Sequence, residues 1–283
     1  MIKHKDIRTE GFSVVTSVYK NDNPTYFDRA LESIYTLQTV RPSEIVLVVD
    51  GPVSDEINKV IEKYQTICGA VLNVIRLEKN GGLGNALRIA VENSSYELVA
   101  RMDSDDVSVP DRFEEQFTVM NTNLSVDIVG GDISEFVGEE CNIVATRKVP
   151  CDDDAIKEYM KTRCAMNHVS VMYKKSAVQK SGGYLDLFWN EDYYLWIRMV
   201  EHGCKMANTG TVLVNVRTGT DMYKRRGGAK YFASEKFLQQ YMLEHKMITR
   251  STYILNLSKR FIIQRLLPNS LRGWVFKTFA RSK

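Results

Sequence analysis

The apolar positions in the first half of the chain follow two alternating patterns. Runs of consecutive apolar residues, many of them β-branched, are typical of parallel strands covered on both faces, and they occupy 12–19, 44–50, 72–77 and 97–103. Between these runs, apolar residues recur every three or four positions, which predicts helices that begin near Pro24 and Pro110 and helices over about 57–67 and 83–91. This alternation predicts an α/β fold with a mostly parallel sheet and right-handed crossovers.

The pattern loosens after about residue 127. Further strands are predicted at 127–137, 169–176 and 211–219. A helix that begins at Glu191 is expected to end at Gly203, and residues 246–283 are helix-like and basic. We therefore expect one domain over residues 1–245, followed by a helical C-terminal tail.

The net charge of +3 hides an asymmetry between body and tail. Eight Lys and Arg residues and no acid follow Thr249, which leaves a net charge of −5 on the rest of the chain. A nucleic-acid binder would carry its positive charge on the folded domain. Nucleic acid is therefore excluded as a partner, and the tail is expected to meet an anionic membrane surface.

Other features of the composition favour a cytoplasmic protein that is peripheral on a membrane. No apolar run is long enough to span a bilayer, and the opening MIKHKDIRTEGF contains no apolar signal segment. The five cysteines are widely spaced and form no C-x-x-C pair, which indicates reduced thiols rather than disulfides or a zinc site. The oligomeric state stays open.

Polar residues follow three of the predicted parallel strands. Tyr19 follows the first strand and Asp50 follows the second, while Asp103 and Asp105 follow the fourth. Ligands of open parallel sheets bind beyond the carboxyl ends of the strands. Asp103 and Asp105 are placed to meet one divalent ion and phosphate oxygens. Alternatively, Asp50 is only a turn residue before glycine.

The aspartates of the DSDD stretch also have a structural interpretation. Asp106 or Ser108 is expected to cap the helix that Pro110 opens, but a cap needs only one side chain. Because one side chain is enough for the cap, Asp103 and Asp105 remain available to bind a metal. Asn80 lies in a glycine-bearing turn before a helix, which is either a phosphate cradle or a flexible helix entry.

A second cluster surrounds the acids at the start of the predicted helix at 191–203. Glu191 and Asp192 follow Trp189 and precede Tyr193 and Trp196, and this mixture of acids and aromatic rings favours a sugar site over simple complementation of the helix dipole. Positive charge for a diphosphate is expected from three residues, of which arginine suits phosphate best: His168, Arg225 and Arg226.

These motifs, in their order along the chain, resemble those of family 2 glycosyltransferases with the GT-A fold. The motifs are VVTSVYKND, VVDGP, KNGGLGNAL, RMDSDD, NHVSVM, SGGY and EDYYLWIRM, and they run from about Phe12 to Gly228. The similarity is greatest to bacterial enzymes that build capsular, exopolysaccharide or O-antigen repeat units. It implies a Rossmann-like central sheet flanked by helices, with a nucleotide-binding half at about 10–125 and an acceptor half at about 126–245.

The resemblance also implies a role for each candidate residue. Asp192 would be the general base, Asp105 the principal metal ligand, and Asp103 would lie near the ribose and the metal. The base of the nucleotide would contact Thr16, Val18, Tyr19 and Asp50. Other donor contacts would come from Asn80, Arg225 and Arg226. Acceptor contacts would come from Glu191, His168, Trp189 and Trp196.

The implied reaction is an inverting, Mn²⁺- or Mg²⁺-dependent transfer of one sugar. The donor would be a nucleotide-sugar, with UDP as the commonest carrier in the family, and the acceptor a lipid-linked saccharide at the inner face of the bacterial plasma membrane. Two departures from the family pattern stand out: Leu87 and Arg88 replace a frequent Arg-Asn pair, and the Q-x-x-R-W motif of processive synthases is absent. The second departure favours addition of a single sugar.

Two other functions compete with this interpretation. A phosphatase of the haloacid dehalogenase type is suggested by DSDDV, which fits D-x-D-x-[TV], although that motif normally ends the first strand and here ends the fourth. A catalytically silent scaffold that binds sugar nucleotides is the other candidate. Such a scaffold has no need to keep Asp103, Asp105 and Asp192 together.

Overall fold

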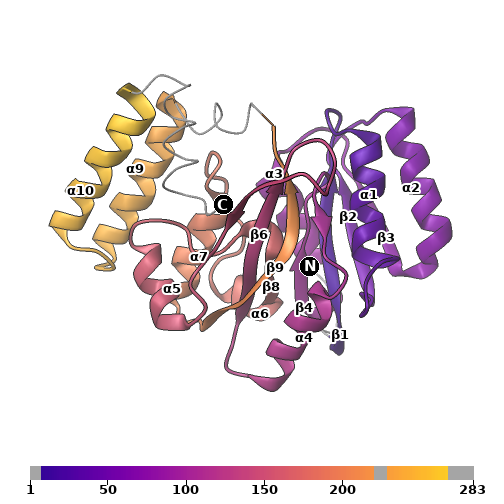
Figure 1. Ribbon diagram of the computed structural model, residues 1–283, viewed down its shortest axis with the longest axis horizontal. Coiled ribbons are helices and arrows are strands. Elements are labelled where there is room, and N and C mark those ends of the chain that lie inside the picture. Colours follow the sequence, from indigo (N-terminus) through magenta and orange to yellow (C-terminus); the bar gives the residue numbers. More distant parts are fainter. Residues whose placement is uncertain (1–7, 220–227, 267–283) are drawn as a thin grey trace.

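The computed structural model describes residues 8–219 and 228–266, and these form a single mixed sheet covered by helices on both faces (Figure 1). The sheet has nine strands in the order β3-β2-β1-β4-β8-β6-β9-β5, with β7 paired to β6. The strands are β1 (Arg8–Val18), β2 (Glu44–Val49), β3 (Leu72–Arg76), β4 (Tyr96–Arg101), β5 (Val107–Ser108), β6 (Ile128–Phe136), β7 (Ile143–Arg147), β8 (Met172–Lys174) and β9 (Met206–Arg217). The helices are α1 (Pro24–Tyr35), α2 (Asp55–Cys68), α3 (Leu83–Asn93), α4 (Arg112–Thr122), α5 (Asp153–Met160), α6 (Lys175–Lys180), α7 (Glu191–Glu201), α9 (Ala229–Glu244) and α10 (Arg250–Phe261).

The first half of the chain confirms the predicted β–α units. β1 pairs in parallel with β2 and β4, and β2 pairs in parallel with β3. All six residues of β2 are buried, which explains why its sequence is apolar without alternation. Helices lie on both faces of the sheet, and each face has its own apolar cluster: α1, α2 and α4 pack on one side, and α3, α6, α7 and α9 on the other.

The second half is less parallel than the first. β8 lies between β4 and β6 and is antiparallel to both, whereas β6 and β9 are parallel. The segment 169–176 was predicted as one strand, but only Met172–Lys174 is extended, because a short 3₁₀ turn precedes it and α6 begins at Lys175.

The predicted cap of the helix after the DSDD stretch is wrong. α4 begins at Arg112, and its N-cap residue, Asp111, makes no side-chain cap hydrogen bond. Ser108 instead belongs to β5 and pairs with Val214 of β9. The Asp106 carboxylate accepts a hydrogen bond from the backbone N–H of Arg217 at 2.8 Å. Asp106 therefore ties the DSDD loop to the end of β9.

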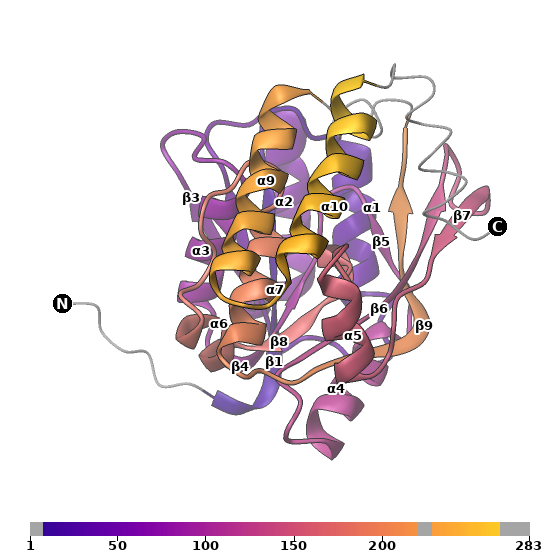
Figure 2. The same cartoon turned by 90° about the vertical axis from the view of Figure 1, so that its left-hand side faces the viewer.

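The C-terminal helices pack on the domain. Asn190, just before α7, donates through Nδ2 to Ser234 Oγ of α9 at 2.9 Å. Asn256 of α10 donates to Gln239 Oε1 of α9 at 2.8 Å, and Arg260 of α10 forms an ion pair with Glu235 of α9. Figure 2 shows α9 and α10 side by side across one end of the molecule. Among the described residues, no helix combines the length and apolar character needed to cross a bilayer.

Candidate active site

The carboxyl ends of β1, β2 and β4 bring the predicted donor-site residues to one edge of the sheet. The parallel register aligns Val18 with Val49 and Val15 with Arg101. Asp50 continues this register, because its N–H donates to the carbonyl of Val18 at 2.8 Å. Tyr19, Asp50 and the DSDD loop therefore open on the same side of the sheet, as the sequence predicted.

Asp50 holds the turn that precedes α3. Asp50 is 4% exposed. Its carboxylate accepts hydrogen bonds from Asn80 Nδ2 at 2.8 Å, Gly81 N–H at 2.7 Å and Gly82 N–H at 3.0 Å. Gly51 has a φ of +86°, and a Cβ there would come within 2.7 Å of the Asn80 nitrogen. The Asp-Gly pair therefore brings the Asn80 turn against the end of β2. The contact of Asp50 with a nucleotide base stays a prediction.

The start of α3 lies next to the start of α7. A Cβ on Gly84 would sit 3.8 Å from the Cβ of Glu191, which is ordinary van der Waals contact. The glycine turn anchored by Asp50 and the Glu191–Asp192 pair are thus neighbours in space, although more than 100 residues separate them along the chain. Burial and the charge of Asp192 are the main causes of the raised pKa of Glu191, and the charges of Arg101 and Asp103 also reach it, so the DSDD loop faces the same region.

Arg101 is the buried cation of the site. It is the last residue of β4 and is 2% exposed. Its guanidinium donates through Nη1 to Asp103 Oδ2 at 2.6 Å and through Nη2 to Asp103 Oδ1, which is a bidentate pair. Arg101 was not among the residues predicted from the sequence. The available signal was a charged side chain inside an otherwise apolar strand, which must have a partner when it is buried.

A second buried arginine supports the first. Arg112 of α4 is fully buried and donates through Nη2 to the carbonyl of Arg101 at 2.7 Å. Burial and the nearby charge of Arg101 lower the pKa of Arg112 to about 9. The end of β4 is therefore fixed by α4 as well as by its neighbouring strands.

Several carboxylates gather above Arg101. Asp105 is exposed, yet partial desolvation and the charges of Asp103 and Asp22 raise its pKa to about 6. Burial, and then the charges of Asp103 and Asp105, raise the pKa of Asp106 well above its usual range. Burial also raises the pKa of Asp22, whose carboxylate accepts hydrogen bonds from Tyr19 N–H and Ser104 Oγ. The negative charge around this loop exceeds the positive charge of the local cations, and a bound cation would offset that excess.

The ligand atoms that this loop offers suit a hard divalent ion. They are carboxylate oxygens, which Mg²⁺ and Mn²⁺ prefer. Within residues 8–219 and 228–266, no three His, Cys, Asp or Glu side chains are grouped to hold a metal by themselves. An ion here would take its remaining ligands from phosphate and water, as Mg²⁺ sites commonly do. Because Asp103 is engaged by Arg101, Asp105 is the carboxylate better placed to bind an ion.

The acids of α7 are half-buried at the N-terminus of the helix. Burial, and then the charge of Asp192, raise the pKa of Glu191 to about 7. Burial also raises the pKa of Asp192, but the N–H of Tyr193 and the charges of Arg101 and Arg147 oppose that rise. Asp192 is therefore the member of the pair that the surroundings favour as a carboxylate, and such a carboxylate can accept a proton.

Two of the predicted acceptor residues differ from expectation. Trp196 is fully buried and packs against Tyr173, with ring centroids 6.2 Å apart, so it offers no face to a sugar. Spacing along the sequence could not distinguish this core position on α7 from a sugar-binding position. His168 is half-buried, and its Nε2 lies 3.0 Å from the hydroxyl of Tyr184. Burial lowers the pKa of His168 well below its usual range, so it is neutral and does not supply the expected positive charge.

Trp189 is the predicted acceptor residue that the structure leaves accessible. It is 52% exposed, lies in the loop before α7 with a φ of +59°, and meets Phe188 edge-on at 6.0 Å between centroids. Positive φ in a bulky residue is uncommon and often marks a functional loop. Trp189 and Phe188 together offer aromatic faces beside the Glu191–Asp192 pair.

The remaining predicted residues differ in what they can contact. The side chains of Thr16 and Val18 are buried, and Val18 belongs to the core, so neither side chain is presented to a ligand. Tyr19 is 39% exposed at the end of β1. Arg225 and Arg226 lie outside the described residues.

We expect Asp103→Asn to destabilise the metal-free protein by about 3 kcal/mol, because it leaves the buried Arg101 cation without its carboxylate partner. Urea unfolding monitored by circular dichroism at pH 8 would measure the change.

The matched control is Asp105→Asn. The folded-state pKa of Asp105 is raised, so its stabilising contribution is fully present below about pH 4 and is lost as the pH rises through about 6. At pH 8 the control should therefore be as stable as the parent chain or slightly more stable. Equal losses in both variants would contradict the assignment of Asp103 as the partner of Arg101.

Comparison with known proteins is consistent with this geometry. The model of the family described as Glycosyl transferase family 2 matches residues 13–179. The chain is 36% identical over 275 residues to the Escherichia coli UDP-Gal:alpha-D-GlcNAc-diphosphoundecaprenol beta-1,3-galactosyltransferase, and the match covers 96% of this chain and 98% of that relative.

Solved structures show the same fold. A crystal structure of S. aureus TarS in complex with UDP-GlcNAc has a TM-score of 0.66 at 17% identity, covering 95% of this chain and 76% of that one. The mannosyltransferase PcManGT from Pyrobaculum calidifontis, in complex with GDP-Man and Mn²⁺, has a TM-score of 0.60 at 13% identity, covering 95% and 75%. The expected GT-A architecture is thus confirmed.

Proposed function

The chain belongs to glycosyltransferase family 2, and on this premise we propose that it transfers one sugar, with inversion, from a nucleotide-sugar to a hydroxyl of a lipid-linked saccharide. The observation that carries the proposal is the meeting of the DSDD loop, the Asp50-anchored turn and the Glu191–Asp192 pair at one edge of the sheet. Family membership replaces the phosphatase interpretation. The donor screen distinguishes the transferase from a scaffold that binds sugar nucleotides without catalysis.

Asp192 is the proposed general base. Inverting transfer requires a hydroxyl oxygen that attacks the anomeric carbon from the side opposite the leaving nucleoside diphosphate, and the hydroxyl proton must be accepted as the bond forms. Asp192 lies at the N-terminus of α7, where the helix dipole favours its ionised form. Glu191, with a pKa of about 7, is suited to donate or accept a hydrogen bond toward the acceptor sugar.

Asp105 and Asp103 are proposed to hold the donor diphosphate through Mn²⁺ or Mg²⁺. When bound, such an ion would stabilise the charge that develops on the leaving diphosphate. Arg101 keeps Asp103 oriented, and the glycine turn anchored by Asp50 borders the same space. Tyr19 is proposed to contact the base, and Trp189 to contact a sugar ring of the acceptor.

The acceptor is proposed to be bound to a lipid. The E. coli relative is named for an acceptor sugar on diphosphoundecaprenol, and residues 246–283 of this chain contain basic residues and no acid. We propose that the protein works at the cytoplasmic surface of the membrane in the synthesis of a surface polysaccharide, with the basic tail in contact with anionic lipid.

The test is a donor screen followed by transfer. Purified full-length protein would be incubated with Mn²⁺ or Mg²⁺ and UDP-, dTDP- or GDP-sugars, and release of nucleoside diphosphate would be measured with and without a polyprenyl-diphosphate-linked sugar. We expect one nucleotide class to be used at least tenfold faster than the others, with one sugar added per acceptor. Donor binding without hydrolysis or transfer across the whole panel would support the silent scaffold instead.

A further inference from the structure

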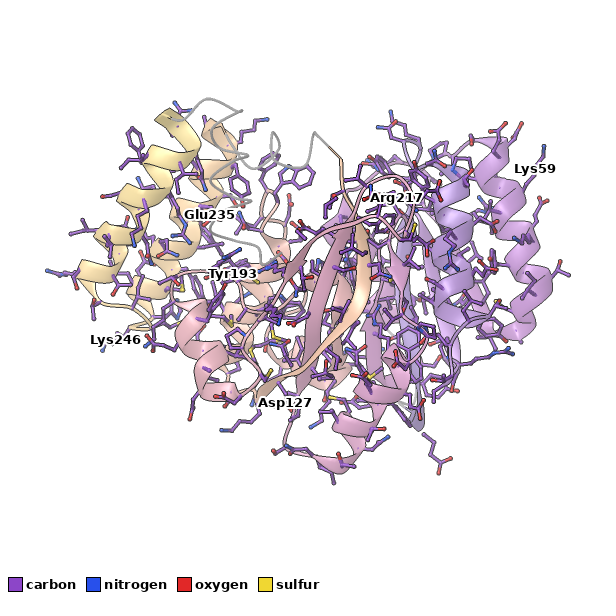
Figure 3. All side chains as sticks on the ribbon, in the orientation of Figure 1. Lys59, Asp127, Tyr193, Arg217, Glu235 and Lys246 are labelled. Atoms are coloured by element: carbon purple, nitrogen blue, oxygen red, sulfur yellow. The ribbon has the colours of Figure 1, made fainter. Side chains whose placement is uncertain are left out.

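A cavity lies between the end of α5, α10 and the turn that joins α9 to α10. Its volume is about 830 Å³. Its walls combine basic and apolar side chains, among them Lys246, Arg250, Lys259, Leu243, Met247 and Leu255. α9 has 16 residues and so spans about 24 Å. The cavity lies at the C-terminal end of this helix, whereas Asn190, just before the Glu191–Asp192 pair, contacts its N-terminal half at Ser234. Figure 3 shows Lys246 and Arg217 far apart on the molecule.

The cavity has an excess of positive charge. Lys246, Arg250 and Lys259 are exposed, and within the described part of the chain none of them forms an ion pair with a carboxylate. The one acid in the wall, Glu158, is paired with Lys161 at 2.5 Å. α10 also begins at this cavity, and its N-terminus adds a partial positive charge. The three unpaired cations are therefore available to an anion.

An apolar stripe on α10 continues from the cavity. Ile254, Leu255, Phe261 and Ile262 are 62%, 53%, 45% and 50% exposed. Ile254 and Leu255 lie seven residues before Phe261 and Ile262, so at 3.6 residues per turn the four side chains lie on one side of the helix, with Ser258 between the two pairs and Ile262 at the start of the π turn that continues α10. Leu255 belongs to both features, because it also lines the cavity. A helix face that joins exposed apolar residues to unpaired cations is typical of helices that lie in a membrane interface.

We propose that this cavity binds the phosphate headgroup of an anionic phospholipid while the stripe on α10 enters the bilayer surface. The phosphate meets Lys246, Arg250 and Lys259, and the acyl chains lie along Leu255 and the rest of the stripe. This deepens the proposed function by naming the lipid and the surface that meet. The proposed membrane contact is then a defined site in the folded chain rather than the basic tail as a whole.

The contacts of α10 give the lipid site a consequence for catalysis. α10 is held to α9 by the Arg260–Glu235 ion pair, and α9 is held to α7 by the Asn190–Ser234 hydrogen bond. A lipid bound at the α9–α10 turn therefore fixes the orientation of the same helix group that carries Asp192. The acceptor hydroxyl, attached to a lipid in the same membrane, then approaches a catalytic edge of defined orientation.

Vesicle flotation with the full-length protein tests the proposal. Phosphatidylcholine vesicles would be compared with vesicles that contain about one third phosphatidylglycerol. We expect the parent chain to bind only the anionic vesicles. The variant Lys246→Gln/Arg250→Gln/Lys259→Gln should bind them at least about tenfold more weakly, since each basic residue near an anionic surface contributes about 1 kcal/mol.

The matched control removes the same charge elsewhere. Lys59 and Lys246 lie at opposite ends of the molecule (Figure 3), and the variant Lys59→Gln/Lys63→Gln/Lys180→Gln should bind anionic vesicles like the parent chain. Equal loss of binding in both triple variants would overturn the site in favour of diffuse charge attraction. Binding of inorganic phosphate to the parent chain, lost in the cavity variant, without any binding of anionic vesicles would overturn the lipid as the ligand. Donor hydrolysis in solution should be unchanged in the cavity variant, so that a failure of the lipid site can be told from a failure of the proposed transferase.

A second substitution tests the apolar contribution. Ile254→Ser/Leu255→Ser changes positions that are 62% and 53% exposed and should leave the unfolding midpoint within a few degrees of the parent chain. We expect it to weaken binding to anionic vesicles severalfold at high salt, where the charge contribution is screened. Unchanged binding at high salt would show that α10 does not enter the bilayer surface.

Discussion

Asp192→Asn is expected to lower sugar transfer by at least about 100-fold while leaving donor affinity unchanged. The amide keeps the shape of the side chain but cannot accept the hydroxyl proton, and a positioned general base contributes about 10²–10⁴ in rate. Steady-state transfer rates and titration with the nucleoside diphosphate would separate the two effects. A merely structural role for Asp192 would instead lower the unfolding midpoint and donor affinity together.

Glu191→Gln is the matched control, because Glu191 is the adjacent acid on the same turn of α7. Burial, and then the charge of Asp192, raise the pKa of Glu191 to about 7, so the neutral amide should cost less than the loss of Asp192. If Glu191→Gln abolished transfer and Asp192→Asn retained it, the two roles would be reversed. The removal of the Asp192 charge should also bring the pKa of Glu191 down, which NMR titration can follow.

Asp105→Ala is expected to remove the dependence of donor binding on metal. In the parent chain we expect Mn²⁺ to increase affinity for the nucleoside diphosphate at least tenfold, or about 1.4 kcal/mol, and in the variant by less than about twofold. The reason is that Asp105 is the exposed carboxylate of the loop, while Asp103 is held by Arg101. Calorimetric titration with and without Mn²⁺ measures both affinities.

Asp111→Ala provides a control for the loss of a negative charge near this loop. Asp111 is exposed, lies just before α4 and makes no side-chain cap bond. Its replacement should leave the metal dependence intact. Undiminished Mn²⁺ enhancement in Asp105→Ala would move the metal away from this residue and would leave Asp103 as the candidate, with Arg101 displaced from it.

Sequence patterns predicted the parallel half of the sheet because its strands and helices have strong, long signals. β2 is a run of six buried residues, and α1 and α2 have clear apolar faces. The other half was harder for physical reasons. β5 is only two residues long, and β7 begins with the exposed Ile143 and Val144, so neither shows a buried apolar run.

The positions of the candidate residues were predicted better than their contacts. Asp50, Asp103 and Asp105 lie where the ends of parallel strands place them, because backbone register decides that. The partners of a side chain depend on packing across the fold, which periodicity does not encode. Asp50 bonding to the Asn80 turn, the Arg101–Asp103 pair and the burial of Trp196 all come from such packing. An aromatic residue three positions after Tyr193 fits a core face as well as a sugar site.

The Arg260–Glu235 ion pair and the Asn256–Gln239 hydrogen bond between α10 and α9 also limit how the chain can be shortened to make the protein more soluble. Cutting the chain before α10 would leave Glu235 and Gln239, which are 8% and 0% exposed, without Arg260 and Asn256 as partners. Each unpaired buried group costs about 1–3 kcal/mol, a large share of the 5–15 kcal/mol that holds a typical domain together. A truncation chosen to detach the protein from membranes would therefore weaken the domain itself. Polar replacements at Ile254 and Leu255, which are 62% and 53% exposed on α10, are the gentler route, because they leave these two polar contacts with α9 in place.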